Sequence, residues 1–321
     1  MRVFITGGAG FIGRSVVRQV GTRGDVVTAI VRNPAAGLGV DGAVPVAGDL
    51  SDVATIERQL AAHDAVIHIA GSYRIGITPE QRRPMWEANV GATQRVLKVA
   101  AQAGIQRIVY VSTVNVFGNT HGRIVDERYR RDLAEGFLSY YDETKYLAHR
   151  AVEERIASKA PIVIAMPGVV YGPNDHSGIG AQLQGAHDGT LGYVALSDTG
   201  ISGVYVEDVG AGIIGALDRG RIGETYVLGG QNVRLRDAMT IAARVGGHRL
   251  PALTLPAGLV RLGARAPAVV ARRAGFPDDL GEVMRSALGV TYWASSAKAA
   301  AELGYAPRDL ASGLRAAFDG S

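Results

Sequence analysis

The chain has 321 residues, more than one average domain, so we expect a large domain joined to a smaller one. An apolar fraction of 47% with a charged fraction of 20% is typical of a globular protein with a sizeable core. The sequence contains no cysteine, which excludes disulfides and thiolate metal sites, and its seven histidines lack zinc-site spacing. We therefore predict no metal.

The net charge of +4 is mildly basic, but the basic residues are dispersed along the chain. Without a basic run, a nucleic-acid partner is not expected. No apolar stretch reaches the roughly 18 residues that a membrane span needs. The N-terminus enters a strand at once and leaves no room for a signal peptide. We expect a cytoplasmic protein that acts on a small molecule and does not bind membranes.

Residues 3–13 predict a strand, a glycine-rich turn and a helix that begins near Phe11. Gly7 permits a sharp turn, Gly10 lets the backbone approach a pyrophosphate, and Gly13 lets the helix lie close to the strand. The first N–H groups of the helix, at Phe11, Ile12 and Gly13, would face the phosphates. The alternative is an ordinary tight turn, but this position between strand and helix favours a dinucleotide site.

The second predicted strand, residues 25–31, ends at Arg32. Units that prefer NAD usually place an acidic residue there, where it binds the ribose 2′-OH. A cation at this position would instead meet a 2′-phosphate, so we favour NADP and keep NAD as the second choice. The competing interpretation is a solvated arginine in a surface turn.

The next two strands are predicted at residues 43–47 and 65–70. After the first of them, Asp49 is placed either to accept a hydrogen bond from the adenine amino group or to cap the next helix, near Asp52. After the second, Ala70 and Gly71 lie at the strand edge where ligands of doubly wound sheets bind. We interpret His68 as a buried structural histidine rather than a catalytic one.

A long helix is predicted over residues 79–103, with Pro84 in its early turns, and a fifth strand over 108–112. Val90, Val96, Leu97 and Ala100 recur at helical spacing and should face the sheet. Strands alternate with crossover helices throughout this half, which predicts an α/β fold with a right-handed, doubly wound parallel sheet.

Candidate catalytic residues follow the fifth strand. Ser112 and Thr113 end it, and a helix then opens that carries Tyr141 and Lys145 four residues apart, hence on one face. A nearby ammonium lowers the pKa of a phenol and makes it a usable acid or base for a carbonyl or carbinol. A hydroxyl of Thr113 or Ser112 could hold the same substrate oxygen. The alternative is a surface pair without function.

Together these motifs resemble an extended short-chain dehydrogenase/reductase of the NAD-dependent epimerase/dehydratase family. Within it the sequence is similar to the dihydroflavonol-reductase-like branch and to hopanoid-associated sugar epimerases. The matching stretches are residues 6–13, 48–50, 68–70, 89–90, 111–118, 167–173 and 296–307, with Tyr141 and Lys145.

The resemblance implies a role for each matching residue. Thr113 would be the catalytic hydroxyl with Ser112 supporting it, and Lys145 would also bind the nicotinamide ribose. The backbone from Pro167 to Val170 would hold the carboxamide. The cofactor-binding residues predicted in this way are Gly7, Gly10, Phe11, Ile12, Gly13, Arg32, Asp49, Leu50, Ala70, Gly71, Lys145, Pro167, Val169 and Val170.

The second half supplies the substrate side. A core strand at 161–166 precedes a Gly- and Pro-rich loop, and residues 176–200 suit a mobile substrate lid. Residues 203–206 are expected to return to the sheet. We predict a Rossmann domain, 1–175 completed by 203–230, and a substrate-binding lobe, 176–202 with 231–321. In the apolar run 252–270 we favour a packed helix over an anion-binding wall built by Arg261 and Arg265.

The leading hypothesis is an NAD(P)-dependent oxidoreductase, favouring NADPH, that reduces an aldehyde or ketone with a Thr/Tyr/Lys triad. The alternatives are a nucleotide-sugar epimerase or dehydratase with tightly bound NAD, and a cofactor-sensing regulator without chemistry. The resemblance also implies a homodimer that pairs the long helix with the catalytic helix. Its seam is predicted at Ala92, Val96, Val99, Leu147 and Val152.

Overall fold

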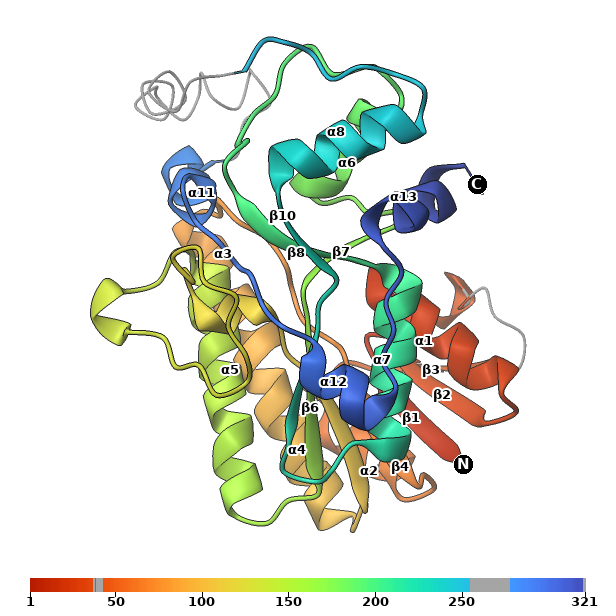
Figure 1. Cartoon of the computed structure of the whole chain (residues 1–321). Coiled ribbons are helices and arrows are strands. Elements are labelled where there is room, and N and C mark those ends of the chain that lie inside the picture. Colours follow the sequence, from red (N-terminus) through yellow and green to blue (C-terminus); the bar gives the residue numbers. More distant parts are fainter. Residues whose placement is uncertain (37, 39–42, 255–277, 320–321) are drawn as a thin grey trace.

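The computed structural model describes residues 1–36, 38, 43–254 and 278–319, and its centre is a parallel sheet (Figure 1). Seven strands follow the order β3-β2-β1-β4-β5-β6-β9. The strand order reverses between β1 and β4, and this switch point is where doubly wound sheets bind ligands. The predicted fold class is confirmed. The strands are β1 (Arg2–Thr6), β2 (Val26–Val31), β3 (Ala43–Ala47), β4 (Ala65–His68), β5 (Arg107–Val111), β6 (Ile162–Pro167) and β9 (Thr225–Leu228).

Helices cover both faces of this sheet (Figure 1). Helices α1 (Phe11–Thr22) and α7 (Val206–Arg219) pack together on one face. Helices α2 (Val53–Leu60), α4 (Ala92–Gln102) and α5 (Tyr140–Ala157) lie on the other. Because both faces are buried, the strands read as continuous apolar runs rather than as alternating ones.

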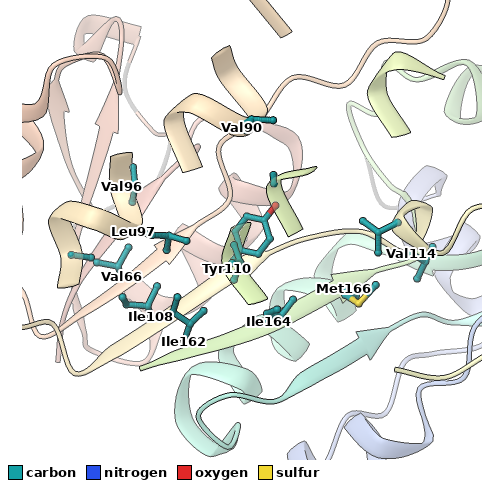
Figure 2. Close-up of a cluster of buried hydrophobic side chains, with 14 of the residues drawn as sticks. Val66, Val90, Val96, Leu97, Ile108, Tyr110, Val114, Ile162, Ile164 and Met166 are labelled. Atoms are coloured by element: carbon teal, nitrogen blue, oxygen red, sulfur yellow. The ribbon is translucent and has the colours of Figure 1, made fainter. Parts of the chain in front are cut away.

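The larger core lies between the sheet and α4 (Figure 2). Ile108 and Ile162 from neighbouring strands meet Val96 and Leu97 of the helix, and all four side chains are buried. Burying each such side chain contributes roughly 1.5–3 kcal/mol. This core holds the strands in place, and the candidate site lies at their carboxyl ends.

The predicted long helix has three parts. Helix α3 (Pro79–Trp86) contains Pro84, a π-helical turn spans Glu87–Gly91, and α4 follows directly. The π turn holds the buried Asn89, whose amide donates to the Ser72 carbonyl at 3.0 Å and to the Thr144 hydroxyl at 2.9 Å. The prediction of a continuous helical stretch is confirmed, whereas periodicity gave no sign of the π turn.

A second, mixed sheet joins β7 (Val169–Tyr171), β8 (Gly200–Tyr205) and β10 (Gln231–Arg234). The expectation that residues 203–206 return to the main sheet is wrong. Residues 203–205 belong to β8, which pairs with β7 and β10, and Val206 begins α7. The seventh strand of the main sheet is β9. Apolar pattern indicates that a segment is a strand but does not decide which neighbour it pairs with.

The smaller sheet is covered by α6 (Gly178–His187), α8 (Leu235–Val245) and α13 (Leu310–Phe318). Helix α6 lies inside the segment that we expected to be a mobile lid, and the hydroxyl of Ser177 caps it by accepting from the Gly180 N–H. Helices α11 (Leu280–Ala287) and α12 (Ala297–Leu303) complete the described part. The predicted helix with Arg261 and Arg265 lies outside the described residues. The proposed domain limits stay a prediction.

Two further expectations concern the surface. Ala92, Val96, Val99 and Val152 cannot form a dimer seam, because the chain's own core buries them; Leu147 is 40% exposed. The apolar stripe that suggested a seam is the face that α4 and α5 turn to the sheet. Among the described residues, no helix is both long enough and apolar enough to cross a membrane. The cytoplasmic location stays a prediction.

Candidate active site

The turn between β1 and α1 has no room for side chains at Gly7 and Gly13. A Cβ on Gly13 would lie 2.0 Å from the Gly7 carbonyl oxygen, and one on Gly7 would lie 2.7 Å from the Ala70 nitrogen. Gly7 also has a φ of +74°. Gly10 caps α1 without a side chain, so the N–H groups of the first helical turn keep no intrahelical acceptor. This bare cradle fits a pyrophosphate.

Arg32 and Asp49 follow the adjacent strands β2 and β3. Hydrogen bonds from Ser51 lower the pKa of the Asp49 carboxyl, and the charge of Arg32 adds to this effect. Asp49 does not cap the next helix, since Asp52 does so by accepting from the Thr55 N–H at 3.2 Å. That alternative for Asp49 is excluded, and the Leu50 carbonyl beside it accepts from Arg95 at 2.8 Å.

His68 is buried at the end of β4. Its Nδ1 lies 2.6 Å from the Thr6 hydroxyl and its Nε2 lies 2.9 Å from the Thr93 hydroxyl. Burial lowers the pKa of His68 to about 3, so the ring is neutral at physiological pH. The structural interpretation of His68 agrees with this geometry, because both ring nitrogens are used to tie β1, β4 and α4 together.

The remaining predicted cofactor residues lie at the same carboxyl edge. Ala70 and Gly71 follow β4, Pro167 ends β6, and Val169 and Val170 lie in β7. A Cβ on Gly71 would lie 3.0 Å from the Asn89 side-chain oxygen, so the chain is closely packed there. The structure thus brings segments from six strands to one edge of the main sheet.

The four predicted catalytic residues lie beside this edge and are all buried. Ser112 and Thr113 follow β5, while Tyr141 and Lys145 share the face of α5 turned to that strand. The Lys145 ammonium donates to the Val111 carbonyl at 3.2 Å and sits 5.2 Å from the centre of the Tyr110 ring. Helix α5 is aligned by its cap, because the Ser139 hydroxyl accepts from the Asp142 N–H.

Burial dominates the electrostatics of the Tyr–Lys pair. It lowers the pKa of Lys145 to about 8. It also raises the pKa of Tyr141, with the neighbouring Tyr73 and Tyr110 adding to the rise and a hydrogen bond with Thr113 opposing it. The expectation that Lys145 lowers the phenol pKa is therefore wrong for this structure. The ammonium is instead directed at the Val111 carbonyl and the Tyr110 ring.

The partner of Ser112 was not predicted. The Ser112 hydroxyl lies 2.9 Å from His149 Nδ1, and His149 Nε2 lies 3.6 Å from the Glu153 carboxylate. The contact with His149 lowers the pKa of Glu153 to about 2. A signal was present in the sequence, because His149 and Glu153 continue the four-residue spacing of Tyr141 and Lys145 along one face of α5.

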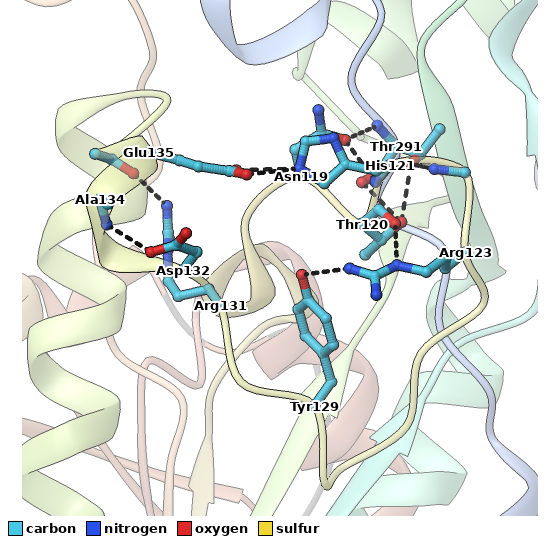
Figure 3. A network of polar contacts seen from close by, with 12 residues as sticks. Asn119, Thr120, His121, Arg123, Tyr129, Arg131, Asp132, Ala134, Glu135 and Thr291 are labelled. Atoms are coloured by element: carbon cyan, nitrogen blue, oxygen red, sulfur yellow. Dashed lines mark hydrogen bonds and ion pairs between the residues drawn. The ribbon is translucent and has the colours of Figure 1, made fainter.

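A buried ion pair next to Tyr141 was also missed. Arg131 contacts Asp142 at 2.6 Å, and their side chains are only 5% and 1% exposed. Arg131 comes from the long loop between β5 and α5, which Figure 3 shows fastened by polar contacts. In that loop Thr120 bonds the Thr291 hydroxyl at 2.8 Å and His121 meets Glu135 at 3.0 Å. Nothing in the local sequence links Arg131 with Asp142.

Hydroxyl, tyrosine and lysine side chains beside a dinucleotide-type glycine turn occur together in extended short-chain dehydrogenases and reductases, and the chain is of that class. More specifically, the sequence profile of the NAD-dependent epimerase/dehydratase family matches residues 3–229, so the chain belongs to this family. The resemblance drawn from the motifs is confirmed. The protein is an NAD(P)-dependent enzyme.

Individual relatives extend the likeness along the chain. A Synechocystis protein provisionally named dihydroflavonol 4-reductase is 30% identical over 79% of this chain and 75% of its own. A Stigmatella aurantiaca protein named 4-hydroxy-2-methyl-3-oxo-4-farnesyl-3,4-dihydroquinoline-1-oxide ketoreductase is 30% identical over 96% of this chain and 92% of its own. The crystal structure of gox2253 matches with a TM-score of 0.82 at 30% identity, covering 98% and 96% of the two chains.

Proposed function

We propose that this protein is an NADPH-dependent reductase that converts an aldehyde or ketone to an alcohol. The observation that carries the proposal is that Thr113, Tyr141 and Lys145 are all buried where β5 ends, with Lys145 donating to the Val111 carbonyl two residues before Thr113. The likeness to a ketoreductase over almost the entire chain supports reduction rather than epimerisation.

The residues divide the chemistry among them. A bound nicotinamide supplies hydride to the carbonyl carbon. Tyr141 donates its phenolic proton to the carbonyl oxygen, and the Thr113 hydroxyl holds that oxygen in place. Lys145 binds the ribose, and its ammonium is held in place by donating to the Val111 carbonyl at the end of β5. Ser112, tied to His149, supports the end of β5 from which Thr113 extends.

The proposed cofactor contacts extend along the carboxyl edge of the main sheet. We place the pyrophosphate on the N–H groups of Phe11, Ile12 and Gly13, which start α1, and Gly10 lets the backbone approach it. Arg32 then meets the 2′-phosphate, and this contact is the reason for choosing NADPH. The other predicted contacts are those of Gly7, Asp49, Leu50, Ala70, Gly71, Pro167, Val169 and Val170.

Steady-state kinetics with NADPH, NADH and a carbonyl panel test the assignment. We expect Tyr141→Phe to lower kcat by about 10²- to 10⁴-fold, since a general acid contributes that much. Tyr146→Phe on the same helix is the matched control and should keep activity. Full turnover by Tyr141→Phe would refute the role of Tyr141 as the proton donor. Equal use of both cofactors, unchanged by Arg32→Ala, would contradict the choice of NADPH.

The epimerase alternative has a distinct signature. The family is named for epimerases and dehydratases, so membership in it is compatible with either a reductase or an epimerase. A tightly bound NAD that fails to exchange with added NADPH, together with turnover of a nucleotide sugar, would reverse the ranking. Binding of cofactor without turnover of either substrate class would instead indicate a regulator.

We also propose a homodimer through the outer surface of α4 and α5. Two large apolar side chains are exposed there, Leu147 of α5 at 40% and Trp86, at the end of the adjoining α3, at 38%. Between the helices lies a shallow hollow lined by Trp86, Gln94, Lys98 and Arg155. Light scattering should show a dimer that Leu147→Asp dissociates, while Leu133→Asp, at an exposed site elsewhere, leaves it intact. A monomeric wild-type protein would contradict the proposal.

A further inference from the structure

Glu282 is a buried carboxylate that joins three distant segments. It lies on α11 and is 4% exposed. Its Oε2 accepts from the N–H groups of Gly76 at 2.6 Å and Ile77 at 3.3 Å, and its Oε1 accepts from the Tyr140 N–H. One side chain of the C-terminal region therefore holds both the loop after β4 and the first residue of the catalytic helix.

Both segments carry an aromatic ring at the candidate site. Tyr140 directly precedes Tyr141, and Gly76 lies three residues after Tyr73. The rings of Tyr73 and Tyr141 meet edge to face, with centroids 4.8 Å apart and planes at 90°. Tyr73 is nonetheless 52% exposed, so part of this residue stays open beside Tyr141.

The surroundings of this aromatic pair are largely apolar. Ile75, Ile77, Met85 and Tyr140 pack with Tyr141 in one cluster. The Asp279 N–H that begins α11 donates to the Gly76 carbonyl at 3.1 Å, which adds a second tie between α11 and the loop. Aromatic rings favour edge-to-face or offset-stacked partners, so an open ring beside the proton donor selects for a flat apolar group.

We propose that Tyr73 is a specificity-determining residue that favours carbonyl substrates carrying an aromatic ring, and that Glu282 is the positioning residue that holds Tyr73 against Tyr141. This inference rests on the proposed reductase activity and names its substrate class. Tyr73 contacts the substrate's ring while Tyr141 protonates its carbonyl oxygen. Glu282 acts through the backbone of the loop and does not touch the substrate.

The contacts of Glu282 make glutamine an informative replacement. Its carboxylate receives hydrogen bonds from three backbone N–H groups, so each carboxylate oxygen serves as an acceptor. In Glu282→Gln the side chain keeps its size, but one oxygen becomes an NH₂ group that faces a donor. A buried donor left without an acceptor is unfavourable, so the loop or the helix end must shift.

The test compares benzylacetone with methyl octyl ketone, two ten-carbon ketones of which only the first has a ring. We expect Tyr73→Ala to lower the aryl-to-alkyl ratio of kcat/KM about tenfold, equivalent to about 1.4 kcal/mol. Tyr73→Phe keeps the ring and should keep the ratio. An unchanged ratio in Tyr73→Ala overturns the inference, whereas absence of ketone turnover by the wild-type enzyme overturns the proposed function.

A double-mutant cycle tests whether Glu282 acts through Tyr73. Glu282→Gln should lower the same ratio in the wild-type background and leave it unchanged in the Tyr73→Ala background, because residues that act together are not additive. The exposed Glu57→Gln serves as the control. Hydrogen exchange of the holoenzyme should show faster exchange at residues 76, 77 and 140 in Glu282→Gln. Equal effects in both backgrounds, or unchanged exchange, refute the role of Glu282.

Discussion

The buried His68 should make the protein sensitive to mild acid. Its ring is neutral in the folded chain, with a pKa of about 3 instead of the ordinary 6.5. Between these values the unfolded chain binds a proton that the folded chain does not, so stability falls as pH falls below 6.5. From about pH 7.5 to about pH 5 this single residue should remove about 2 kcal/mol from the free energy of unfolding.

Urea unfolding at these two pH values measures the effect directly. His68→Gln keeps a polar side chain between Thr6 and Thr93 but does not titrate, so its loss of stability on acidification should be about 2 kcal/mol smaller than that of the wild type. His248→Gln, at an exposed histidine, should behave like the wild type. If wild type and His68→Gln lose equal stability, the argument for a neutral buried ring is refuted.

Three further outcomes follow from packing and charge. Gly13→Ala places a Cβ 2.0 Å from the Gly7 carbonyl oxygen, so NADPH affinity in a fluorescence titration should fall about ten- to hundredfold. Unchanged affinity would contradict the proposal that this glycine turn binds the pyrophosphate. Lys145→Met should lower kcat about 10²-fold yet raise the unfolding free energy near pH 7 by about 3 kcal/mol, because it removes a buried charge whose pKa is lowered to about 8. Arg131→Ala leaves the buried Asp142 carboxylate without its ion-pair partner and should lower the free energy of unfolding, measured in urea, by about 3–5 kcal/mol. A loss below about 1 kcal/mol would show that solvent reaches the carboxylate.

The Rossmann half was predictable because its pattern is local. Apolar runs of strand length, glycines at the first turn and a capping residue such as Asp52 each act over a few neighbouring residues. The predicted third strand matches β3 (Ala43–Ala47) in full, and α5 begins directly after Ser139. The stretch around 203–206 was misplaced because pairing of β8 with β7 and β10 depends on segments far apart in the chain.

The candidate site shows the same division. Tyr141 and Lys145 were found because a spacing of four places them on one helical face. The neighbours of these residues were not found. Tyr73 reaches Tyr141 from the loop after β4, Glu282 of α11 reaches the backbone of Tyr140, and Arg131 reaches Asp142 from the long loop after β5. The acidity of Tyr141 was misjudged because it depends on burial, which spacing does not report.

By itself, the order of residues determined the strand–turn–helix units, the glycine cradle and the Tyr–Lys pair, since each depends on interactions within about one helical turn or one tight loop. Only the tertiary structure decided the pairing of β8 and β9, the environment that sets the pKa of Lys145 and Tyr141, and the carboxylate of Glu282 that holds two segments of the site together. Burial and long-range hydrogen bonding arise when the chain is packed, and they have no local signature to be read beforehand.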